Sequence, residues 1–346
     1  MSHKKWLMTT LVTAAFCLAA TAGLNALIDP FFHYHSPLPG LSYSFGNQNY
    51  VNPGIVRRFD YDTLITGTSM TENFRPSVFE EILDAEAVKT SYSGGKSANF
   101  RNLIDLALRS NPGLKTVYMG LDLNMLDDED PALPREPHPT YLYDEKPLND
   151  ANYLLNKSVL ILSTGTFLLD TAAGLPPATF DDYNYWNDDD AHMFGRLADE
   201  FERVRGSYGD RSDQWPREQL LAMAEEHLRL NIIPLVEAWP QTDFVFFFPP
   251  YSILYWHNKN TEDIVAVLEY AIETLIGYEN VRLFLPMNNA AIITDPGYYK
   301  DAGHYSGAIN DFLVQCFRDG THLLTVENYQ EELARLTELV NGHYTQ

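Results

Sequence analysis

The sequence predicts an α/β fold in which helices cover both faces of a parallel sheet. Between residues 63 and 317, short apolar runs typical of strands alternate with helical patterns. The run Phe-Val-Phe-Phe-Phe at 244–248 is apolar at every position, as expected of a central strand that is buried on both faces. Hydrophobic residues form 45% of the 346-residue chain, which is enough for a large core.

The predicted elements follow one another in strict alternation over most of the chain. The strands are expected at residues 63–67, 87–91, 116–121, 243–248 and 281–285. The helices are expected at residues 77–83, 98–109, 217–238, 261–276 and 307–317. Parallel strands need a crossover between them, and a helix is the usual crossover, so this order indicates a parallel sheet of about five strands.

Residues 124–215 interrupt the alternation and contain no convincing strand. A helix is expected around residues 151–171, between the acidic stretches 127–130 and 188–190. Loops of this length without secondary structure are uncommon in compact domains, so we expect a partly helical insertion. It leaves the sheet at the carboxyl end of the third strand, where open α/β folds bind their ligands. Neither acidic stretch has calcium-loop spacing and the histidines lack zinc spacing, so we expect no metal.

The N-terminal segment predicts where the protein works. Residues 6–28 carry no charge and are long enough to cross a membrane as one helix. Lys4 and Lys5 precede this segment, which predicts a cytoplasmic N-terminus and an extracytoplasmic C-terminal domain at the cell membrane. Cleavage near Ala22, followed by secretion, is the alternative. We favour an uncleaved anchor at residues 1–29, because apolar character continues past Ala22; an ordered connector at 30–56 and the main domain at 57–346 follow.

The net charge excludes some partners. At −23, the chain has no basic stripe with which to bind nucleic acid. The same charge argues against electrostatic attachment to an anionic lipid surface. Contact with the membrane is therefore expected through the N-terminal helix.

Ser69 has two possible roles. With Glu72 it matches a capping box, in which a serine hydroxyl caps the start of a helix. Alternatively it is a nucleophile, which requires a base and a group that orients the base. Asp301 and His304 stand three residues apart before a predicted helix, so one turn can present both to the same site.

Two motifs resemble those of a known enzyme superfamily. Gly67-Thr-Ser69 after the first strand and Asp301-Ala-Gly-His304 late in the chain resemble the SGNH, or GDSL-type, hydrolases. The anchored layout is similar to their membrane-attached branch, which includes the D-alanyl transfer protein of lipoteichoic acid biosynthesis and the alginate acetylation proteins. Residues 29–32 and 65–70 also resemble uncharacterised surface proteins of Gram-positive bacteria. The resemblance implies a three-layer, flavodoxin-like α/β/α fold and catalysis without a metal or cofactor.

The resemblance also implies the roles of the site residues. Ser69 would attack, His304 would act as general base and acid, and Asp301 would orient His304. The amides of Ser69, Gly94 and Gly95 would form the oxyanion hole, although the two glycines also fit an ordinary turn. Asp122 stands where the superfamily commonly has an asparagine donor, and an ionised carboxylate cannot donate. Either Asn124 takes that role, or Asp122 orients another group, or the hole has only two backbone donors. Tyr251 is expected to line the pocket.

These observations predict an extracytoplasmic serine esterase or O-acyltransferase. Its substrates would be acyl esters of a cell-surface glycan or a teichoic-acid-like polymer, so its partners would be that polymer or an acyl donor. The alternative is a non-catalytic surface protein of the same fold that serves as a scaffold or binding partner of a membrane O-acyltransferase. Asp122 in place of asparagine supports this alternative.

Overall fold

The computed structural model describes residues 2–126, 128–211 and 215–345, in two compact units. The first unit comprises Met1–Phe59 and Pro137–Thr179, and the second comprises Asp60–Glu136 and Phe180–Gln346. Part of the expected insertion, namely Asp127 and residues 212–214, lies outside the described residues.

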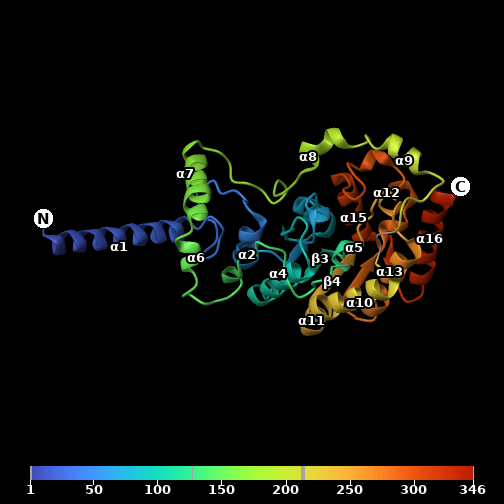
Figure 1. The fold of residues 1–346 in the computed structure, drawn as a ribbon, viewed down its shortest axis with the longest axis horizontal. Coiled ribbons are helices and arrows are strands. Elements are labelled where there is room, and N and C mark those ends of the chain that lie inside the picture. The colour runs from blue at the N-terminus through green and yellow to red at the C-terminus, as the bar shows by residue number, and fades with distance from the viewer. Residues whose placement is uncertain (1, 127, 212–214, 346) are drawn as a thin grey trace. The chain divides into compact units, whose positions relative to one another are not determined.

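A parallel sheet forms the centre of the second unit, as predicted. Its strand order is β2-β1-β3-β4-β5-β6, and all neighbours are parallel except β5 and β6. Strands β3 and β4 run through the middle of this unit (Figure 1). The strand bounds are Thr63–Thr66 (β1), Ala87–Lys89 (β2), Thr116–Gly120 (β3), Asp243–Phe247 (β4), Val281–Phe284 (β5) and Leu323–Leu324 (β6).

Helices flank the sheet in two groups, which confirms the three-layer α/β/α prediction. Helices α3 and α15 pack together on one face, and α4, α10, α11, α13 and α16 pack in a row. The helix bounds are Pro76–Leu83 (α3), Ser97–Ser110 (α4), Leu123–Leu126 (α5), Asn187–Asp190 (α8), Ala198–Val204 (α9), Arg217–His227 (α10), Ile233–Ala238 (α11), Ile253–Trp256 (α12), Thr261–Leu275 (α13), Ala290–Ile293 (α14), Gly307–Asp319 (α15) and Tyr329–Thr345 (α16). The 3₁₀ turns are Ser69–Thr71 (η1), Ala191–Met193 (η4), Pro286–Asn288 (η6) and Pro296–Tyr298 (η7), and η5 (Leu228–Ile232) is π-helical.

An aromatic cluster binds the sheet to its α3 and α15 face. Tyr118 of β3 lies 5.0 Å, between ring centroids, from both Phe79 of α3 and Phe317 of α15. Phe247 and Phe284 of the next two strands contact the same Phe317 ring. Alternate residues of a strand point to opposite faces of the sheet. Helices cover both faces, so every position of the Phe-rich strand β4 except the exposed first is buried.

Three features of the second unit differ from the expected elements. Strand β6 has two residues, too few for a recognisable alternating pattern, and α16 follows the last predicted helix. The helix expected at 217–238 is interrupted by η5. Pro234 stands in the first turn of α11 and lacks a backbone N–H, which removes one rung of the helical hydrogen bonds and accounts for the break.

The first unit joins the N-terminal helix to part of the expected insertion. It contains α1 (His3–Ile28), α2 (Gln48–Arg58), η2 (Thr140–Leu142), α6 (Ala151–Leu154), π-helical η3 (Val159–Thr164) and α7 (Gly165–Ala172). Within the described part of the chain, α1 alone is long and apolar enough to cross a membrane, a test that a signal sequence also passes. Asp29 ends α1, and its carboxylate accepts hydrogen bonds from the amides of His33, Tyr34 and His35 and from the Tyr153 hydroxyl. These bonds order the chain that leaves the helix.

Candidate active site

The carboxyl edge of the sheet holds a cavity of about 650 Å³. Its wall is built by the loops that follow successive strands, the position at which open α/β sheets bind ligands. All eight residues predicted for the site line this cavity: Ser69, Gly94, Gly95, Asp122, Asn124, Tyr251, Asp301 and His304. The structure therefore brings together residues that are more than 200 positions apart in sequence.

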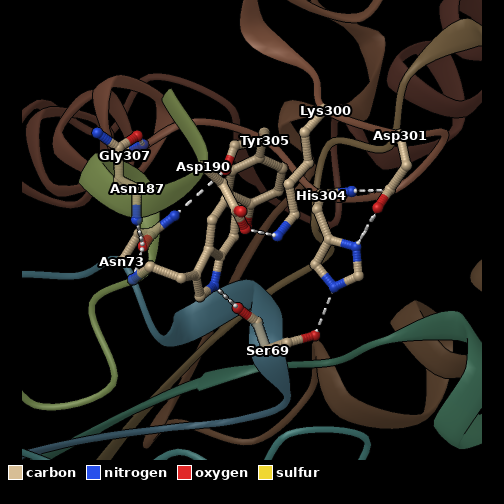
Figure 2. Close-up of polar contacts among 10 residues, drawn as sticks. Ser69, Asn73, Asn187, Asp190, Lys300, Asp301, His304, Tyr305 and Gly307 are labelled. Atoms are coloured by element: carbon tan, nitrogen blue, oxygen red, sulfur yellow. Dashed lines mark hydrogen bonds and ion pairs between the residues drawn. The ribbon is translucent and has the colours of Figure 1, made fainter. Parts of the chain in front are cut away.

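Ser69, His304 and Asp301 form a continuous chain of hydrogen bonds (Figure 2). The Ser69 hydroxyl lies 2.8 Å from His304 Nε2, and His304 Nδ1 lies 2.8 Å from Asp301 Oδ2. A carboxylate at Nδ1 selects the tautomer with its proton on that nitrogen, which leaves Nε2 to accept from the serine. This arrangement can remove a proton from the serine hydroxyl during attack on a carbonyl.

The loop between η7 and α15 fixes Asp301 and His304 relative to each other. Tyr299 and Tyr305 form an antiparallel bridge that closes the loop. Inside it, Asp301 Oδ1 accepts the backbone N–H groups of Gly303 at 2.9 Å and His304 at 2.8 Å. Partial burial opposes ionisation of Asp301, but hydrogen bonds from the His304 ring and these amides outweigh it and lower the pKa of the carboxyl to about 2.

The capping interpretation of Ser69 is wrong, because the neighbouring residue caps the turn. The N-cap of η1 is Thr68, whose hydroxyl accepts from the Met70 N–H at 3.3 Å. The turn is only three residues long, and α3 begins later with Arg75 as its own N-cap. The Ser69 hydroxyl is thus directed to His304 while Thr68 satisfies the local backbone.

Two of the backbone amides expected to form the oxyanion hole have no acceptor within the described part of the chain. Among the described residues, none accepts from the N–H of Ser69 or of Gly94, and both residues line the cavity. The N–H of Gly95 donates instead to the Tyr92 carbonyl at 2.9 Å, so the expected pair of glycine donors is reduced to Gly94. Gly94 has a φ of +60°, a left-handed backbone conformation that favours glycine.

Both carboxylate oxygens of Asp122 accept hydrogen bonds from groups that line the cavity. Its Oδ2 accepts from the Thr68 hydroxyl at 2.9 Å, and its Oδ1 accepts from the Asn124 N–H at 3.0 Å and from the Tyr251 hydroxyl. Burial and the nearby Asp122 charge raise the pKa of Tyr251 well above its usual value, which keeps this hydroxyl a donor. Tyr251 therefore does line the cavity, with its hydroxyl committed to Asp122. The exposed Asn124 side chain lines the cavity and makes no hydrogen bond with any described residue.

A segment around Trp186 and Asn187, which the sequence did not single out, connects the turn that carries Ser69 with the start of α15, just after His304. Asn73, four residues after Ser69, accepts from the N–H groups of Trp186 and Asn187, both at 3.1 Å (Figure 2). Asn187 in turn accepts from Gly307 at the start of α15, at 2.7 Å. The Trp186 ring meets His304 edge-on, and its indole N–H donates to the Ser69 carbonyl at 3.4 Å. No spacing in the sequence indicates these contacts, because they depend on how a loop folds over the site.

Two lysines near the site, Lys300 and Lys89, were not predicted from the sequence. Lys300 Nζ lies over the face of the Trp186 ring, 3.7 Å from its centroid. The same ammonium pairs with Asp190 (Figure 2). Lys89, at the end of β2, is fully buried and donates to the carbonyls of Glu72 and Phe74, just after the Ser69 turn. Burial lowers the pKa of Lys89 to about 7, against the attraction of nearby carboxylates.

Comparisons with known proteins gave a likeness among solved structures only. No protein-family model and no curated protein matches it. Among solved structures, one of a Streptococcus pneumoniae protein, provisionally described as a platelet activating factor, aligns with a TM-score of 0.40 and 11% sequence identity. The alignment covers 79% of this chain and 90% of that one. The likeness is too distant to bear on function, which rests on the site itself.

Proposed function

We propose that this protein is an extracytoplasmic serine esterase or O-acyltransferase of SGNH type, held at the cell membrane by α1. The observation that carries the proposal is the hydrogen-bonded chain from Ser69 through His304 to Asp301 in a cavity at the carboxyl edge of the sheet. The substrate would be an acyl ester of a cell-surface glycan or a teichoic-acid-like polymer. The expected export of the second unit and the Ser-His-Asp arrangement support this class of substrate.

The residues fit a two-step acyl transfer. Ser69 Oγ forms a bond to the acyl carbonyl carbon while its proton moves to His304 Nε2. The N–H groups of Ser69 and Gly94, with the Asn124 amide, hold the resulting oxyanion. Collapse breaks the ester bond, and the leaving alkoxide takes the proton from His304. Water or a polymer hydroxyl then attacks the acyl-serine by the same steps in reverse.

Two observations weigh against the scaffold alternative. It would be favoured by a Ser69 hydroxyl bonded only as a helix cap, whereas this hydroxyl lies against His304. Asp122 at the asparagine position argued for inactivity, but its carboxylate accepts from the walls of the cavity and Asn124 lines the same cavity. A complex with a membrane O-acyltransferase remains compatible with catalysis by this chain as the second step of a transfer.

Intact-mass measurement after exposure to a fluorophosphonate tests the proposal. The full chain in detergent should gain one adduct, and both Ser69→Ala and His304→Ala should abolish it. Ser93→Ala is the matched control, because Ser93 is an exposed serine next to Gly94 and should react as the wild type does. An adduct that survives Ser69→Ala, or no adduct on the folded wild type, would contradict the proposal.

The substrate class is tested with the same protein. Esterified glycans and teichoic-acid-like polymers carrying a labelled acyl group should lose the label to water or to an added polymer hydroxyl. Labelled acyl-enzyme that depends on Ser69 should accumulate in single-turnover mixtures. Reaction with small esters but with none of these polymers would retain the serine chemistry and reject the polymer assignment.

A further inference from the structure

The first unit carries an exposed apolar face on the segment formed by residues 155–175, which includes η3 and α7. Five large side chains on it are exposed: Leu155 by 44%, Ile161 by 55%, Leu168 by 43%, Leu169 by 71% and Leu175 by 52%. Between them, Val159, Thr164 and Phe167 point inward and are buried. Ile161, Leu168 and Leu169 lie within η3 and α7, while Leu155 precedes η3 and Leu175 follows α7. Single exposed leucines are ordinary on a protein surface, whereas several close together in one short segment suggest an interaction site.

This segment is attached to the C-terminal end of α1. The buried side chain of Asn25 donates to the Leu154 carbonyl at 2.8 Å and accepts from the Thr164 hydroxyl at 3.3 Å. Helices α6 and α7 stand at that end of α1, and α7 runs crosswise to it (Figure 1). The exposed side chains of Leu24 and Leu27 extend the apolar surface of α1 towards this junction.

The length of α1 sets the depth of the junction. A hydrocarbon core of about 30 Å takes roughly 20 helical residues at a rise of about 1.5 Å each. Counted from Trp6, the first residue after Lys4 and Lys5, the far boundary of the core falls near Asn25. The segment bonded to Asn25 therefore lies at the level where acyl chains meet lipid headgroups. A helix that lies across α1 at this depth is parallel to the membrane surface.

The composition of the segment fits the same position. Lys157 and Asp170 are its two charged residues, so it is attracted to lipid by apolar burial and not by charge. Among the described residues of η3 and α7, the exposed side chains are apolar and the inward side chains pack into the first unit, so no polar face directs these helices to water. Without a membrane contact, this apolar face would be exposed to water although it adjoins α1, which itself lies in lipid.

We propose that residues 155–175 form a membrane-interface helix, with Ile161, Leu168 and Leu169 inserted among the acyl chains of the outer leaflet that α1 crosses. The occupant of this face is the phospholipid bilayer. The helix gives the first unit a second attachment beside α1 and prevents it from swinging freely about the end of the anchor. This proposal rests on the proposed uncleaved anchor and is independent of the proposed chemistry.

Spin-label accessibility in lipid nanodiscs tests it with the full chain. Four single-cysteine proteins are compared: native Cys17 in a Cys316→Ser background, and Ile161→Cys, Leu169→Cys and Val326→Cys in a Cys17→Ser and Cys316→Ser background. Cys17 lies in the middle of α1 and reports the anchor, while Val326 is an exposed apolar residue of the second unit and serves as the matched control. Collisions of the nitroxide with oxygen report lipid, and collisions with a water-soluble nickel chelate report solvent.

Labels at 17, 161 and 169 should give several-fold higher ratios of oxygen to nickel collisions than the label at 326. Water-like values at 161 and 169, with a lipid-like value at 17, would overturn the interfacial helix and retain the anchor. Protection of 161 and 169 from both reagents would also overturn it, because a second copy or another protein would then cover the face. Loss of the segment that carries Cys17 from the purified chain would overturn it by removing its premise.

Discussion

Asp301 and Asp122 line the same cavity but have different surroundings. Asp301 has a half-exposed side chain, and its partners are one imidazole and the backbone of its own loop. Asp122 is 4% exposed and accepts from groups that follow three different strands, in Thr68, Asn124 and Tyr251. In the proposed mechanism the first carboxylate orients a base, whereas the second connects the loops that form the walls of the cavity. The partners of a carboxylate, more than its presence in a site, therefore indicate its role.

The largest contrast is expected from Asp301→Asn. The amide preserves the size of the side chain but can present its N–H₂ to His304 Nδ1, which favours the wrong imidazole tautomer. We expect the rate of fluorophosphonate labelling of Ser69 to fall by about 10⁴-fold, with the fold retained. Rates are measured by intact mass against time. A fall of less than tenfold would show that Asp301 does not orient the base.

Asn124→Ala should have the next largest effect. It removes the proposed third oxyanion donor, and loss of one such donor costs about 10²-fold or more in rate. The side chain is exposed and makes no hydrogen bond with any described residue, so unfolding by urea should be unchanged. Ester hydrolysis and denaturation are measured on the same preparation. An unchanged hydrolysis rate would leave only the Ser69 and Gly94 amides as oxyanion donors.

Asp122→Asn should be milder for catalysis than Asp301→Asn, although both exchange a carboxylate for an amide. The amide oxygen can still accept from Tyr251 and Asn124, and Thr68 can rotate its hydroxyl to accept from the new N–H₂. We expect a loss of about 1–3 kcal/mol in the free energy of unfolding and less than about tenfold in rate. Urea denaturation and labelling rates measure the two quantities. A rate loss equal to that of Asp301→Asn would give Asp122 a direct part in the chemistry.

The smallest effect is a pH dependence of stability that belongs to Asp301. Its folded pKa of about 2 lies below the ordinary value of 3.8, so the unfolded chain binds the proton first as the pH falls. The contribution of Asp301 to the free energy of unfolding is therefore complete above about pH 4 and is lost towards pH 2. It amounts to at most about 1 kcal/mol, because the side chain is half exposed and solvent screens its interactions. Urea midpoints of the wild type should fall more steeply than those of Asp301→Asn over this range. Asp199→Asn, which changes an exposed carboxylate outside the site, should follow the wild type.

The sheet and its order of elements could be predicted from the sequence because periodicity and apolar runs are local signals. The first five strands and the helices between them appear close to their expected bounds. Strand β6 is two residues long, and the break at Pro234 depends on how one helix adjusts its hydrogen bonds, so neither has a clear local signal. The insertion was expected as one segment, yet residues 137–179 pack with the N-terminal helix. Such pairing of distant segments is decided by tertiary contacts.

For the site, the sequence by itself determined which residue types stand after which strand. Ser69, Gly94, Asn124 and the Asp301–His304 pair all reach one cavity because parallel strands end at the same edge of a sheet. Only the tertiary structure decided which atoms meet. In the folded chain Thr68 caps the η1 turn, and the Gly95 N–H donates to the Tyr92 carbonyl. The Asp122 carboxylate accepts from groups in the cavity wall. Hydrogen bonds depend on ångström-scale distances and on direction, and a sequence carries neither for residues that are far apart along the chain.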